Sequence, residues 1–131
     1  MLNRRHVMVA VALALGATFT VASLARAAQD YSAQAFAAAQ DAGKPILLHI
    51  TAPWCPTCKA QKPILGKLEA EPRFKNLVVL NIDFDSQKAL LQKLRVAQQS
   101  TLIVYKGKSE VGRSVGDTNP QSIDALLTKA E

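Results

Sequence analysis

Residues 46–63 read ILLHITAPWCPTCKAQKP, an apolar run that ends in a turn carrying the two cysteines of the chain, Cys55 and Cys58. Two thiols at this spacing can close a disulfide with each other while the first sulfur stays at the N-terminus of a helix. There, unpaired backbone N–H groups and the helix dipole favour a thiolate. We expect Cys55 to be the N-cap and Pro56 the first helical residue, where a missing N–H has no cost. The pattern indicates thiol–disulfide exchange.

Two other uses of the cysteine pair fit the sequence less well. A structural zinc site needs four ligands, and the chain adds only His6 and His49 to its two cysteines, with His6 in an N-terminal segment of different character. A structural disulfide across so short a loop constrains the unfolded chain less than a long closure does. Both uses remain alternatives to redox chemistry.

Residues 1–27 have the character of an export signal. Arg4 and Arg5 precede an apolar run over residues 7–15, and Ala25-Arg26-Ala27 fits a cleavage site of small residues. We therefore expect cleavage after Ala27 and a periplasmic protein. A retained membrane anchor is the alternative, although the apolar run is short for a spanning helix.

The remaining residues, 28–131, are enough for one small domain with a single core. The whole chain carries a net charge of +6, to which Arg4, Arg5 and Arg26 of the expected signal contribute. The positive excess that remains is too small and dispersed to indicate a nucleic-acid partner. An oxidising compartment lets a disulfide persist, so a catalytic pair there must be reset by other redox proteins.

Strand and helix patterns alternate along this domain. The predicted elements are a helix over 30–42, a buried strand over 46–50, a helix over 55–70 that Pro63 kinks or interrupts, a strand over 77–82, a helix over 86–96, a strand over 101–105, a polar edge strand over 109–115, and an amphipathic helix that starts at Asn119-Pro120. This order predicts an α/β fold in which helices cover both faces of a mixed sheet.

Residues 46–63 resemble the active-site region of thioredoxins. The shared features are an apolar strand, an aromatic residue before Cys-x-x-Cys, Lys59 directly after the second cysteine, and Pro63 five residues beyond it. Asn81-Ile82-Asp83, Thr101–Lys106 and Val115-Gly116 then follow in thioredoxin order. The resemblance therefore covers essentially all of residues 28–131.

The length of the middle helix and Gly43-Lys44-Pro45 look most like the C-terminal periplasmic domain of the bacterial transmembrane thiol:disulfide interchange reductase. The resemblance implies a thioredoxin-like three-layer fold with a mixed central sheet flanked by helices. It also implies an exported thiol–disulfide oxidoreductase that acts as a reductant or electron relay and needs no dissociable cofactor.

The family chemistry assigns Cys55 as the attacking thiolate and Cys58 as the resolving thiol, so that together they form the redox-active disulfide. The implied partners are protein disulfide substrates and a redox protein that resets the pair, which we expect to be membrane-embedded. We expect a monomer. A partner-binding thioredoxin fold with idle cysteines is a further alternative, because a fold does not fix a function.

Trp54, Pro56, Ser100 and Thr101 are the implied substrate contacts. Ser100 stands where most thioredoxins carry a cis-proline, and we expect a trans bond because a cis bond before another residue costs about 2.5–4 kcal/mol. The Ser100 hydroxyl has two alternatives, a hydrogen bond to the Cys55 sulfur or one to nearby backbone. The missing proline makes Cu(I) binding or a metallochaperone role, through the same two thiolates, the alternative function.

His49 stands where thioredoxins carry a buried acidic residue. A neutral imidazole there can accept the proton of Cys58, provided that it lies within hydrogen-bond reach directly or through one water. The alternative is a core histidine bonded to backbone. Between the cysteines, Pro56-Thr57 replaces the Gly-Pro of thioredoxins, and related families span potentials from about −270 to −120 mV. The direction of electron flow is therefore open.

Overall fold

Five strands form one mixed sheet in the order β1-β3-β2-β4-β5 in a computed structural model that describes residues 27–131. The expected export segment, apart from Ala27, lies outside the described residues. The elements are β1 (Gln29–Asp30), α1 (Ala33–Asp41), β2 (Pro45–Thr51), α2 (Pro56–Glu69), the short 3-10 helix η1 (Pro72–Phe74), β3 (Val78–Asp83), α3 (Lys88–Lys93), β4 (Thr101–Lys106), β5 (Ser109–Val115) and α4 (Pro120–Thr128).

The centre of the sheet is β2, which pairs in parallel with β3 and antiparallel with β4. Neighbouring strands cover both its edges and helices cover both its faces, so residues 46–50 are all buried. β5 pairs antiparallel with β4 and forms one edge, while β1 pairs in parallel with β3 and forms the other. The predicted mixed sheet and polar edge strand are confirmed.

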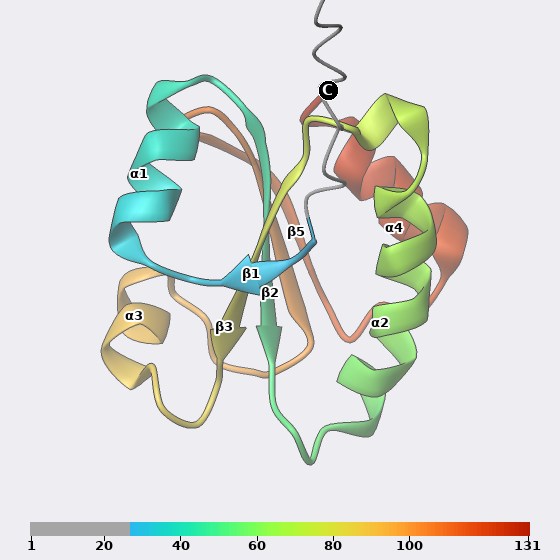
Figure 1. Cartoon of the computed structure of the whole chain (residues 1–131). Helices are drawn as coiled ribbons and strands as arrows, with labels where there is room; N and C mark the ends of the chain where they lie inside the picture. The colour runs from blue at the N-terminus through green and yellow to red at the C-terminus, as the bar shows by residue number, and fades with distance from the viewer. Residues whose placement is uncertain (1–26) are drawn as a thin grey trace, which may run out of the picture.

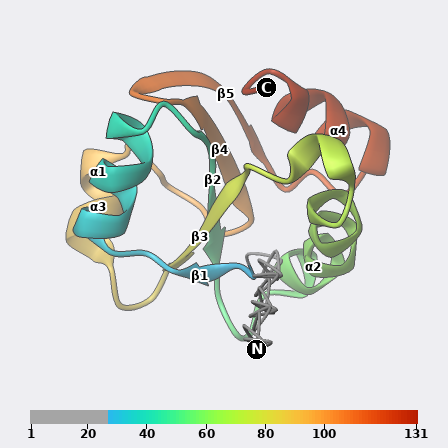
Figure 2. The same ribbon diagram turned by 45° about the horizontal axis from the view of Figure 1, so that its top comes forward.

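Helices cover both faces of this sheet. Figure 1 shows α1 and α3 on one face and α2 and α4 on the other, and the turned view in Figure 2 keeps the same three layers. Each interface holds its own apolar cluster of buried side chains. The cluster under α2 and α4 includes Leu47, Leu65, Phe74, Leu102 and Leu127, and the one under α1 and α3 includes Ile46, Leu48, Leu80, Leu91 and Ile103. Within residues 27–131, no helix is long and apolar enough to cross a membrane.

Local capping explains where two of the helices begin. The side chain of Ser32 accepts the backbone N–H of Ala35 at 3.0 Å, and that of Asn119 accepts the N–H of Ser122 at 3.0 Å. Pro120 occupies the first turn of α4, as predicted. α1 begins three residues later than predicted, because Gln29 and Asp30 extend the sheet beside β3 as β1. Two residues are too few to give a strand pattern.

Two further helices differ from the prediction. α2 continues through Pro63, so of the predicted kink or interruption the interruption is wrong, and the kink stays a prediction. Pro63 leaves the Lys59 carbonyl without its usual helical partner, and Lys59 lies at an exposed position that solvent can reach. α3 is shorter than predicted: the Asp83 carboxylate accepts the N–H groups of Asp85 and Ser86 and holds the chain in a turn before the helix, and Arg95 has a positive φ of 55° just after it.

Candidate active site

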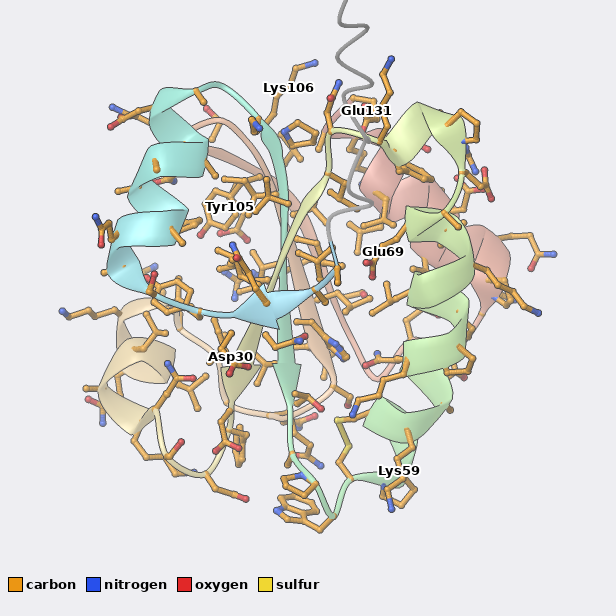
Figure 3. The ribbon with its side chains drawn as sticks, viewed as in Figure 1. Asp30, Lys59, Glu69, Tyr105, Lys106 and Glu131 are labelled. Atoms are coloured by element: carbon orange, nitrogen blue, oxygen red, sulfur yellow. A yellow bond between two sulfur atoms is a disulfide. The ribbon has the colours of Figure 1, made fainter. Side chains whose placement is uncertain are left out.

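The Cys-x-x-Cys turn lies between the carboxyl end of β2 and the start of α2. Cys55 is the N-cap of α2, and its Sγ accepts the backbone N–H of Cys58 at 3.1 Å. Pro56 occupies the first turn of the helix, so the predicted cap is confirmed. A disulfide joins the two cysteines, whose Cα atoms lie 5.3 Å apart, and Figure 3 shows this sulfur–sulfur bond near the start of α2.

Both cysteines are buried in this disulfide form. Cys55 is 1% exposed and Cys58 0%, and the pair packs in a small cluster with Ala52 and the partly buried Phe84. The disulfide holds both sulfurs within this cluster. What distinguishes the two is their position at the helix terminus.

Trp54 lies directly before the disulfide and is 55% exposed. Its indole N–H donates to Asp85 Oδ2 at 2.8 Å, and its ring meets Phe84 edge-on at a centroid distance of 6.5 Å. These two contacts hold a large aromatic face in solvent beside the cysteines. Such a face is suited to contact the backbone or apolar side chains of a partner protein.

Ser100 and Thr101 lie at the start of β4, and both are buried. The Ser100 hydroxyl donates to the Gln99 carbonyl at 2.6 Å, and the Thr101 hydroxyl donates to the Gln98 carbonyl at 2.7 Å. The backbone alternative for Ser100 is therefore the observed one, and the hydroxyl does not bond the Cys55 sulfur. Residues 27–131 contain no cis peptide bond, and Ser100 has a left-handed φ of 55°.

His49 is buried on β2, opposite Asn81 on one side and Leu102 on the other. Its Nε2 lies 3.1 Å from Gln61 Oε1, so its partner is a side chain rather than the backbone expected of a core histidine. Burial lowers the pKa of the ring, and the charge of Lys62 lowers it further, against hydrogen bonds to Gln61 and Asn81 that raise it. Cys58 Sγ has the Ile50 carbonyl at 4.0 Å, and the role of His49 as a base stays a prediction.

The residue that the sequence reasoning missed is Gln61. Its side chain is fully buried, and its amide nitrogen donates to the carbonyls of Ser100 at 3.1 Å and Asp117 at 2.9 Å. The sequence signal that could have found it is the spacing of the buried face of α2, on which Cys58, Gln61, Leu65 and Leu68 recur every three or four residues. A buried polar side chain needs hydrogen-bond partners, and those of Gln61 lie beneath the cysteine turn.

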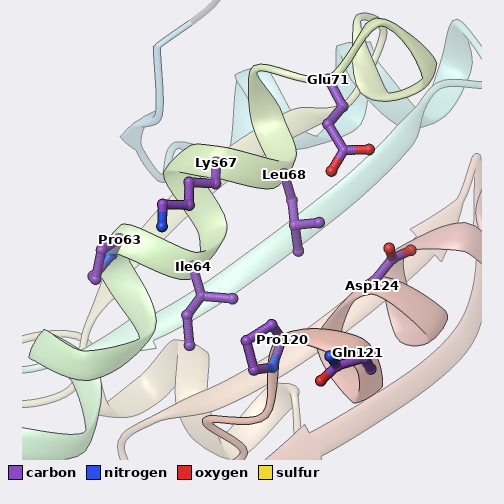
Figure 4. A pocket seen from close by; sticks show the side chains of 8 residues that line it. All are labelled: Pro63, Ile64, Lys67, Leu68, Glu71, Pro120, Gln121 and Asp124. Carbon is purple, nitrogen blue, oxygen red and sulfur yellow. The ribbon is translucent and has the colours of Figure 1, made fainter.

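A separate groove of about 410 Å³ lies between α2 and α4, away from the cysteines. Figure 4 shows its eight lining side chains, which include Ile64 and Leu68 on α2 and Pro120 and Asp124 on α4. Within residues 27–131, no group of three or more His, Cys, Asp and Glu side chains is placed to hold a metal ion.

Comparisons with known proteins agree with this geometry. The thioredoxin family model matches residues 27–129. A thioredoxin of Chlamydia trachomatis is 34% identical over 84 residues, which are 64% of this chain and 80% of that protein. The thiol:disulfide interchange protein DsbE of Escherichia coli K12 is 34% identical over 74 residues, 56% of this chain and 39% of that protein. The crystal structure of Trxlp from Edwardsiella tarda superposes with a TM-score of 0.75 at 46% identity, over 77% of this chain and 98% of that one.

Proposed function

Since this chain belongs to the thioredoxin family and is a thiol–disulfide oxidoreductase, we propose that it is exported and acts as a reductant or electron relay for protein disulfides. The observation that carries the proposal is the place of Cys55 at the N-cap of α2, where its Sγ accepts a backbone N–H. That position stabilises a thiolate, which is the nucleophile of disulfide exchange.

The exchange proceeds in two steps. The Cys55 thiolate attacks one sulfur of a partner disulfide, so that a mixed disulfide forms and the other partner sulfur leaves as a thiolate. Cys58 then loses its proton, with His49 as the proposed base, and its sulfur attacks Cys55. The mixed disulfide breaks, the second partner sulfur takes the proton that Cys58 gave up, the first takes a proton from solvent, and the Cys55–Cys58 disulfide remains. Two electrons have passed to the partner.

The oxidised pair must be reduced again by another protein, because the chain has two cysteines and both are used in the exchange. We assign this step to a dithiol redox partner in the membrane. The exposed face of Trp54 beside the disulfide supports a protein as the docking partner, with Pro56, Ser100 and Thr101 as the further proposed contacts.

Export is the second part of the proposal. Its support is the sequence of residues 1–27 and the match to the family model, which starts at Ala27. Expression of the full chain in a Gram-negative bacterium should yield a periplasmic protein whose first residue is Ala28, and an Ala27→Phe variant should retain the segment, because cleavage requires a small residue. Recovery of the uncleaved wild-type chain from the membrane fraction would support the anchor alternative instead.

Insulin reduction and metal content separate the redox function from the Cu(I) alternative. The reduced wild-type protein should accelerate insulin precipitation by dithiothreitol, and Cys55→Ser should lose this acceleration because the nucleophile is gone. A wild-type protein that holds one equivalent of Cu(I) and leaves the insulin rate unchanged would instead identify a metal-binding module.

The reduction potential tests the direction of electron flow. A reductant or relay should equilibrate with glutathione at a potential nearer to the thioredoxin value of about −270 mV than to the about −120 mV of a strongly oxidising enzyme. A potential near the oxidising end would reverse the assigned direction while leaving the exchange chemistry of Cys55 and Cys58 intact.

A further inference from the structure

Gln61 connects three parts of the molecule beneath the cysteine turn. It lies on α2, three residues after Cys58, and is fully buried. Its side chain contacts His49 on β2, the Ser100 carbonyl before β4 and the Asp117 carbonyl between β5 and α4. A buried amide with a partner for its oxygen and two for its nitrogen is held in one orientation.

The partners themselves determine this orientation. The carbonyl oxygens of Ser100 and Asp117 can accept hydrogen bonds but cannot donate them, so the NH₂ group of Gln61 must face both. A flipped amide would place its oxygen against two carbonyl oxygens. The Gln61 oxygen therefore faces Nε2 of His49 at 3.1 Å, and a hydrogen bond there requires a proton on Nε2.

Burial also favours the neutral form of the ring. His49 is 2% exposed, and burial lowers the pKa of its imidazole. A neutral imidazole carries one proton, and the amide of Gln61 requires that proton on Nε2, so the lone pair lies on Nδ1. We propose that Gln61 is a positioning residue that holds His49 in the Nε2–H tautomer and leaves Nδ1 as the nitrogen that takes a proton during resolution of the mixed disulfide. This inference rests on the proposed function only for its kinetic consequence.

Resolution of the mixed disulfide moves one proton from Cys58 through His49 to the departing partner sulfur. The Cys58 thiol gives its proton to Nδ1, directly or through one water, and its sulfur attacks Cys55. The Cys55–partner bond breaks, and the partner sulfur leaves with the electron pair and is then protonated from the imidazolium. While the ring is charged, the Nε2–H bond to the Gln61 oxygen becomes a charge-assisted hydrogen bond and stabilises it.

A purely structural role for Gln61 is the competing account, since its amide also ties Ser100 to Asp117. The Ser100 carbonyl accepts a second hydrogen bond from Gly116 N–H at 2.9 Å, so part of this connection persists without Gln61. The test must therefore have a readout that loss of structure alone does not move. The tautomer of His49 is such a readout.

Nitrogen-15 NMR of the labelled full chain reads the tautomer directly, at a pH about one unit above the ordinary histidine pKa of ~6.5. A His6→Ala variant assigns the second histidine. We expect wild-type His49 to carry its proton on Nε2, and Gln61→Leu to give a mixture of tautomers, while the exposed Gln92→Leu on α3 leaves the spectrum unchanged. A wild-type ring protonated on Nδ1, or an unchanged tautomer in Gln61→Leu, would overturn the inference whether or not the protein reduces disulfides.

Stopped-flow kinetics test the consequence for the reaction. Gln61→Leu should slow resolution of the mixed disulfide by about 10-fold to 10²-fold and leave its formation unchanged, because it acts through a proton transfer in the second step. In a His49→Leu background the same change should have no further effect on resolution. Equal slowing in both backgrounds would assign Gln61 to the structure alone. Failure of wild type to form any mixed disulfide would instead count against the proposed function, and the NMR result would stand by itself.

Discussion

Cys55 combines two properties at one position, because the residue that caps α2 is also the residue proposed to attack. Its Sγ accepts the N–H of Cys58, and the unpaired donors and dipole of a helix N-terminus favour the charged sulfur. This part of the site is predictable from the sequence, because capping and the proline in the first turn are local preferences. The structure has Cys55 at the N-cap of α2 and joined to Cys58 by a disulfide, as the Cys-x-x-Cys spacing predicts.

The partners of Gln61 could not be predicted in the same way. They lie 12, 39 and 56 residues away along the chain, at His49, Ser100 and Asp117. Such contacts depend on how α2 packs on β2 and on the loops that flank β4 and α4. The sequence could place Gln61 on the buried face of a helix and His49 on a buried strand, but the pairing between them is a tertiary fact.

His49 should contribute a measurable pH dependence to stability. Its pKa is lowered by burial in the folded state, so below about 6.5 the unfolded chain takes up a proton that the folded protein does not. Stability should therefore fall as the pH drops from about 6.5 toward the lowered pKa of the folded protein, and stay constant above that range. Urea unfolding of the oxidised protein across this window should show the fall in wild type and a smaller one in His49→Leu. Parallel curves for the two proteins would show that the ring is not buried in its neutral form.

Ser100 should tolerate glycine and reject proline. A left-handed φ of 55° is strained for serine, whereas the proline ring fixes φ near about −65°. Ser100→Pro should lower the free energy of unfolding by more than about 1 kcal/mol, and Ser100→Gly should keep it equal or raise it. Ser100→Ala, which keeps the strain and loses the hydroxyl, is the control for the bond to Gln99. A proline variant as stable as wild type would mean that this loop takes a different backbone path.

At the scale of elements, the prediction was best for the strands. β2, β3, β4 and β5 lie within one residue of their expected bounds, because apolar runs between turns mark buried strands clearly. The helices were less accurate at their ends: α3 lost residues to the turn that Asp83 holds, and η1 was not predicted because a single turn has no periodicity. Buried Phe74 in η1 nevertheless belongs to the core under α2 and α4.

Two glycine substitutions test the packing of these elements in opposite directions. A Cβ on Gly112 in β5 would lie 2.7 Å from Leu126 Cδ1 on α4, whereas a Cβ on Gly66 in α2 would meet nothing within 4 Å. Gly112→Ala should destabilise the fold by about 1–3 kcal/mol, because the buried Leu126 side chain must repack to make room for the new methyl group. Gly66→Ala should stabilise it by about 0.5–1 kcal/mol, because alanine favours the helix. Thermal unfolding of both variants decides the comparison, and equal shifts would contradict the contact between β5 and α4.

At the scale of the whole molecule, alternation of strands and helices was enough to predict one α/β domain with helices on both faces of a mixed sheet. The order of the strands in that sheet was not predictable from the pattern, because pairing is set by tertiary contacts. The two-residue β1 was missed for the same reason: it is a strand by virtue of its bonds to β3. The site depends on this architecture, since β2, α2 and the loop before β4 meet beneath the cysteine turn.

The most direct test of the central claim is to trap the mixed disulfide. A Cys58→Ala variant keeps the nucleophile and lacks the resolving thiol, so it should accumulate covalent adducts with a disulfide substrate such as insulin, and peptide mapping by mass spectrometry should place every adduct on Cys55. The matched Cys55→Ala variant should form few or none. Adducts that form through Cys58 in Cys55→Ala, with none on Cys55 in Cys58→Ala, would reverse the order of attack and contradict the assignment of Cys55 as the nucleophile.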